Sequence, residues 1–192
     1  MSFLLEIGEI VAGLGREVEV DTTTSTLTVE SDLPEQPRLL VVVRQQTQAV
    51  TFYATHPHTV PAERLADVAE LVVRATGNEF TVALELDYDN RTVTTRVGLE
   101  LFGTVLSGEE TEALLAVLLV ELESVARCYG PAVDAVVAGE LTPAVAAESG
   151  QSARRQERFD EASQALDEAS SALDEAVAAL DADPPAARTP AE

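Results

Sequence analysis

The spacing of hydrophobic positions changes along the chain from helical to strand-like and back. Apolar residues repeat every three or four positions over residues 3–14, which predicts a helix. Three β-rich runs follow, at residues 26–30, 38–44 and 48–55. Residues 39–43 are apolar without a break, and this pattern is typical of a central strand covered on both faces.

The next part of the chain predicts a second helix and a hairpin. Val60-Pro61-Ala62-Glu63 begins the helix, because the missing N–H of a proline would lack a partner in the first turn anyway. Gly77 follows the apolar stripe, where a helix cap requires positive φ. Alternating positions then flank a polar turn at residues 87–90; they are Phe80, Val82, Leu84 and Leu86 before it, and Val93, Thr95, Val97, Leu99 and Leu101 after it. This alternation predicts an antiparallel hairpin with one buried face.

A long third helix is predicted to begin at a capping box. Ser107 and Glu110 have the spacing at which a hydroxyl and a carboxylate each satisfy an unpaired backbone N–H. The apolar stripe of this helix continues as far as Tyr129-Gly130, and Pro131 begins a further turn that ends near Gly139. Thr142-Pro143 is predicted to begin one last short helix.

The composition changes after Gly150 to three near-identical, Ala-rich heptads. Leu166, Leu173 and Leu180 of these heptads fall seven positions apart, and Phe159 continues the same spacing before them. This is the pattern of a coiled-coil seam, and a lone helix of this length is marginal without pairing or docking. We therefore expect a globular domain over residues 1–149, a heptad helix over 150–182 and a disordered Pro- and Ala-rich tail over 183–192.

Charge restricts the partners of this chain. There are 34 Asp and Glu residues against 12 basic ones, a net charge of −22, and every basic residue is arginine. Such a surface repels phosphate and anionic lipid, so nucleic acid and membranes are not expected partners. It also repels itself unless salt screens it, and the Debye length is about 3 Å at 1 M salt. We favour a halophilic, salt-rich cytoplasm over a GC-rich genome that merely encodes Arg for Lys.

Other features of the sequence predict a cytoplasmic protein. The single cysteine, Cys128, cannot form an internal disulfide. Glu6 and Glu9 interrupt the apolar stretch that a signal peptide would need. The longest strongly apolar run, residues 113–120, is far shorter than the roughly 20 residues of a membrane-spanning helix.

No catalytic set can be assembled from the sequence, and we expect no enzyme, no cofactor and no metal. His56-Pro57-His58 places two imidazoles at a spacing that zinc accepts, but no further Cys or His lies nearby and carboxylates are too abundant to select one. A loop that joins a strand to a helix is the preferred interpretation. Cys128 follows the apolar stripe of the third helix and is expected to be a small packing residue, because no partner histidine is identifiable.

Residues 3–147 resemble the YbjN family, whose fold is similar to that of type III secretion chaperones. The resemblance rests on the order of the elements and on short motifs: Val60-Pro61-Ala62-Glu63-Arg64, the hairpin over residues 80–99, Tyr129-Gly130-Pro131-Ala132, and Leu141-Thr142-Pro143. It implies an α+β domain of helix, three strands, helix, hairpin and long helix. It also implies a non-enzymatic, chaperone-like protein that shields a segment of a partner protein.

The oligomeric state and a second function follow from the same observations. The resemblance and the heptads together predict a homodimer. The alternative function is a regulatory adaptor in sensory or stress signalling, which recruits a helical partner through Phe159, Leu166, Leu173 and Leu180 while the globular part is only a scaffold.

Overall fold

The computed structural model describes residues 2–182, and the predicted tail at 183–192 lies outside the described residues. The chain divides into two units, Met1–Arg154 and Arg155–Glu192. Within residues 2–182, no helix combines the length and the apolar character that crossing a bilayer would require.

The first unit is built around a six-stranded antiparallel sheet with the strand order β1-β2-β3-β4-β6-β5. The strands are β1 (Val18–Asp21), β2 (Thr26–Leu33), β3 (Gln36–Arg44), β4 (Ala49–Thr55), β5 (Ala83–Asp87) and β6 (Thr92–Glu100). The helices are α1 (Phe3–Gly13), α2 (Leu65–Thr76), α3 (Gly108–Ala138) and α4 (Pro143–Ala182), with a 3-10 turn, η1 (Ala62–Arg64), before α2. The predicted α+β class is confirmed at this level.

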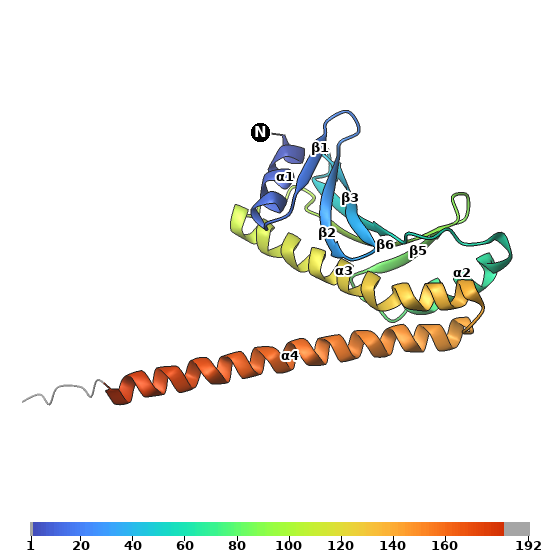
Figure 1. Cartoon of the computed structure of the whole chain (residues 1–192). Helices are drawn as coiled ribbons and strands as arrows, with labels where there is room; N and C mark the ends of the chain where they lie inside the picture. The colour runs from blue at the N-terminus through green and yellow to red at the C-terminus, as the bar shows by residue number, and fades with distance from the viewer. Residues whose placement is uncertain (1, 183–192) are drawn as a thin grey trace, which may run out of the picture. The chain divides into compact units, whose positions relative to one another are not determined.

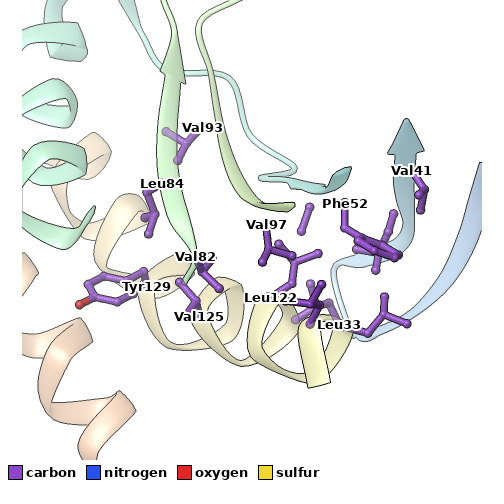
Figure 2. Close-up of a cluster of buried hydrophobic side chains, with 14 of the residues drawn as sticks. Leu33, Val41, Phe52, Val82, Leu84, Val93, Val97, Leu122, Val125 and Tyr129 are labelled. Carbon is purple, nitrogen blue, oxygen red and sulfur yellow. The ribbon is translucent and has the colours of Figure 1, made fainter. Parts of the chain in front are cut away.

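Helices cover one face of the sheet, and Figure 1 shows α1 and α3 lying along the same side of the curved strands. Alternate residues of every long strand point into this layer. Figure 2 shows the core there; its members include Leu33, Val41, Phe52, Val82, Leu84, Val93, Val97, Leu122, Val125 and Tyr129. Burying these apolar side chains contributes about 25 cal/mol per Å², which drives the layers together.

Within the described part of the first unit, the helices leave the other face of the sheet open, so the expectation of a strand covered on both faces is wrong. Leu39, Val41 and Val43 are buried, whereas Leu40 is 46% exposed on the opposite side of β3. The unbroken apolar run arose because hydrophobic residues also occupy the open face. Leu40 pairs there with Tyr53 of β4.

Three other boundaries differ from the predictions. Four strands precede α2, where three were predicted. The additional strand is β1, an edge strand of four residues, which the sequence did not reveal because it is short and its alternation is weak. Phe80 lies before β5 and is fully exposed. Gly77 caps α2 with φ of −66°, so no left-handed conformation is needed there.

The two C-terminal helices are longer than expected. α3 continues through Pro131, which is exposed, while its neighbours Tyr129 and Ala132 are buried and hold the helix in place. The predicted capping box of Ser107 and Glu110 is present, and Gly139 ends the helix with φ of +75°. The predicted short helix after Thr142 is instead the first part of α4, which is 40 residues long.

Candidate functional site

A groove of about 490 Å³ lies between α3 and the turn that joins β2 to β3. Its lining on α3 is made mostly of small or apolar residues: Ala126, Gly130, Pro131, Ala135 and Ala138. Leu33 at the end of β2 and Pro34 in the turn line it on the other side. A Cβ built on Gly130 would meet no atom within 4 Å, so the floor is open at that point. The volume falls in the range of about 300–1,000 Å³ that is typical of ligand sites.

A buried carboxylate fixes the two walls of the groove. Glu123 of α3 is 2% exposed. It accepts hydrogen bonds from Ser31 Oγ at 3.1 Å, from the Asp32 backbone N–H at 2.9 Å and from Arg16 Nη2 at 2.9 Å. Three donors compensate the desolvation of the charge, and they tie the end of β2 to α3.

Two imidazoles and one carboxylate meet at one edge of this groove. His56 Nε2 lies 2.9 Å from Asp134 Oδ1, and His58 Nδ1 lies 3.3 Å from the same oxygen. The two rings stand edge to face, with centroids 5.5 Å apart. Because a carboxylate oxygen can only accept, each contact is a hydrogen bond in the tautomer whose hydrogen lies on the ring nitrogen that faces Asp134.

Local structure explains why these side chains meet. β4 ends at Thr55, and the backbone N–H of His56 donates to the Val93 carbonyl at 2.8 Å, so His56 stays in line with the sheet. His56 is buried, whereas the side chain of His58 is 62% exposed. Asp134 lies on α3 next to buried Val133, which fixes the helix face that it occupies.

The sequence identified the two histidines and missed their partner. Asp134 is 76 positions from His58, and no spacing rule connects residues so far apart. One signal was available: Asp134 is the only charged residue among the small and apolar positions 130–139. An isolated acid in such a run often has a specific partner, because burying a charge without one is costly.

The other candidate residues do not join this site. Cys128 is half-buried and packs against the hydrophobic core, as expected for a small packing residue. In the second unit, Phe159, Leu166 and Leu173 lie on α4 and are 67%, 71% and 64% exposed. Leu180 also belongs to α4, and its side chain lies outside the described residues.

Comparisons with known proteins match the chain to solved structures. No family model matches the chain, and no curated protein does. Among solved structures, the chain is similar to the crystal structure of YbjN, "a putative transcription regulator from E. coli", with 13% identity and a TM-score of 0.48, over 62% of this chain and 85% of that one.

Proposed function

We propose that the protein is a non-enzymatic binding protein that holds a short apolar segment of a partner protein in the groove beside α3. The observation that carries this proposal is the groove itself, about 490 Å³ in volume, with small apolar residues along its floor. Small residues let a bound main chain approach α3 closely, and apolar side chains of the segment would replace water there.

The polar residues that line the groove fit a peptide. Gln36, Arg127 and Glu140 line the same groove and offer both donors and acceptors to the main chain of a segment. The net charge of −22 disfavours anionic ligands such as nucleic acid. Buried apolar area would contribute about 25 cal/mol per Å² before the cost of ordering the segment, so micromolar affinity is expected.

A peptide-display selection on the full chain in high salt tests this function. Peptides enriched on the unmodified protein should bind at least tenfold more weakly to Ala135→Glu, because this half-buried residue lines the groove and a glutamate would fill it with charge. Ala153→Glu is the matched control, since Ala153 is exposed on α4 and does not line the groove. Equal binding to both variants would exclude the groove as the binding site.

The second candidate is the adaptor function, and the row of exposed hydrophobic residues on α4 favours it. Phe159, Leu166 and Leu173 remain more than 60% exposed and are seven positions apart, the arrangement that a partner helix would cover. The double variant Leu166→Asp and Leu173→Asp separates the two functions. Peptides selected by the groove should still bind it, whereas a helical partner of the heptads should not.

A further inference from the structure

The side chains of His56, His58 and Asp134 form a set of metal-ligand type. One ligand atom from each lies within 4.8 Å of the others. Imidazole nitrogen together with carboxylate oxygen is a donor set that zinc and neighbouring first-row cations accept. We propose that this triad binds a divalent first-row transition-metal cation.

The distances are close to those that a small cation requires. Ligand atoms about 2.0–2.1 Å from a tetrahedral zinc ion lie about 3.4 Å from one another. Asp134 Oδ1 is 2.9 Å from His56 Nε2 and 3.3 Å from His58 Nδ1. These two distances are within about half an ångström of that value, and the two ring nitrogens lie within 4.8 Å of each other, so the exposed ring of His58 has to move toward His56 as the ion enters. A neutral imidazole presents its bare nitrogen to the metal and carries its one hydrogen on the other ring nitrogen, whereas an imidazolium must first release one proton to solvent.

The three residues differ in how firmly the fold holds them, and this difference favours metal binding. Two of them are held in place, His56 directly after β4 by its backbone hydrogen bond to Val93 and Asp134 by its position on α3. His58 lies in the loop after β4 and has the most exposed side chain of the three. Its ring can therefore adjust to complete the coordination, while the other two ligands stay in place.

The groove supplies an open coordination position. His56 and Asp134 both line it, so three protein ligands would leave a fourth position directed to water or to a donor from a bound molecule. Gln36 Oε1 lines the same groove, is buried and has no hydrogen-bond partner among the described residues. A water molecule bound to the ion would donate a hydrogen bond to Gln36 Oε1. The proposed site does not depend on the peptide-binding function.

The measurement must distinguish Zn²⁺ bound by the triad from cations bound by carboxylates on the acidic surface. Carboxylates alone prefer hard cations, whereas imidazole selects zinc and its neighbours. The full chain, freed of metal with a chelator, is titrated with Zn²⁺ in molar KCl and excess Mg²⁺, which occupies the surface carboxylates. One Zn²⁺ per chain is expected under these conditions. Co²⁺ in place of Zn²⁺ should give the visible absorption of a nitrogen- and oxygen-ligated ion.

Variants identify the ligands. His58→Ala and Asp134→Asn should each weaken Zn²⁺ binding at least tenfold, and both residues are exposed enough for the fold to survive the change. Glu148→Gln removes a carboxylate from an exposed position of α4 and should leave the affinity unchanged. Several weak sites that respond equally to all three variants, or no binding in excess Mg²⁺, would overturn the proposal and leave the triad as a hydrogen-bonded contact only.

Discussion

Gly150 of α4 lies directly against the ring of Tyr129 of α3: a Cβ built on Gly150 would stand 2.3 Å from Tyr129 Cδ1. Only a glycine permits this approach. Four residues later, buried Arg154 donates hydrogen bonds to Ser124 Oγ and Glu121 Oε2 of α3. The first part of α4 is therefore built into the globular unit, and the change of composition after Gly150 does not coincide with a break in the helix.

Replacing Gly150 tests this contact. Gly150→Ala should lower the free energy of unfolding by about 1–3 kcal/mol, the usual cost of overpacking a core. Gly130→Ala is the matched control, because a Cβ there meets no atom within 4 Å and alanine favours a helix by roughly 0.5–1 kcal/mol. Denaturant melts of both variants decide the matter. A Gly150→Ala protein as stable as the control would show that the two helices do not touch at this position.

Replacing Glu123 should lower the free energy of unfolding far more than replacing an acidic residue on the exposed surface. Glu123→Ala would leave the mostly buried Arg16 without that partner, and breaking a buried pair costs about 3–5 kcal/mol. Glu19→Ala removes an exposed partner of Arg38 and should change stability by less than about 1 kcal/mol. Urea unfolding of both variants gives the comparison. A similar loss of unfolding free energy in the two variants would contradict the role given to Glu123.

The protein should lose stability in alkali through Tyr129. Burial, aided by the nearby charge of Glu79, raises the pKa of Tyr129 above its ordinary value. The unfolded chain therefore releases this proton first, so the stabilising contribution is complete below about pH 10 and is lost as the pH rises through the pKa of the folded state. Tyr129→Phe should flatten the fall of the unfolding free energy above pH 10. Parallel curves for the two proteins would contradict this assignment.

Stability should depend strongly on salt. A net charge of −22 with no lysine gives a self-repulsion that screening relieves. Thermal melts from 0.1 to 3 M KCl should show the melting temperature rising steeply at first and then levelling off. A melting temperature that stays constant over this range would contradict the halophilic interpretation.

A homodimer is expected in high salt, with the heptads of α4 as one pairing surface. Light scattering at tens of micromolar measures the mass directly. If the heptads drive pairing, Leu173→Asp should give monomers, because it places a charge on the seam. Ser171→Asp, an exposed position off the seam, should leave the dimer intact. A monomer for the unmodified chain would exclude the prediction.

The sequence by itself determined the elements whose causes are local. The capping box of Ser107 and Glu110 and the end of the helix near Gly139 depend on residues within one helical turn. The turn at residues 87–90 is likewise local, since Asp87 accepts hydrogen bonds from the backbone N–H groups of Asp89 and Asn90. Periodicity also placed most of the buried positions, because the helical and strand periods are fixed by backbone geometry.

Only the tertiary structure decided the rest, and the reason is distance along the chain. The sequence of β3 alone does not predict that Leu40 faces solvent, because the helices that cover a face of the sheet come from other parts of the chain. Pro131 lacks an N–H, yet packing of its neighbours keeps α3 continuous. His56 and Asp134 are 78 positions apart, and Arg16 and Glu123 are 107 apart. Such partners meet only when the sheet and α3 have packed, so the candidate site is a property of the fold.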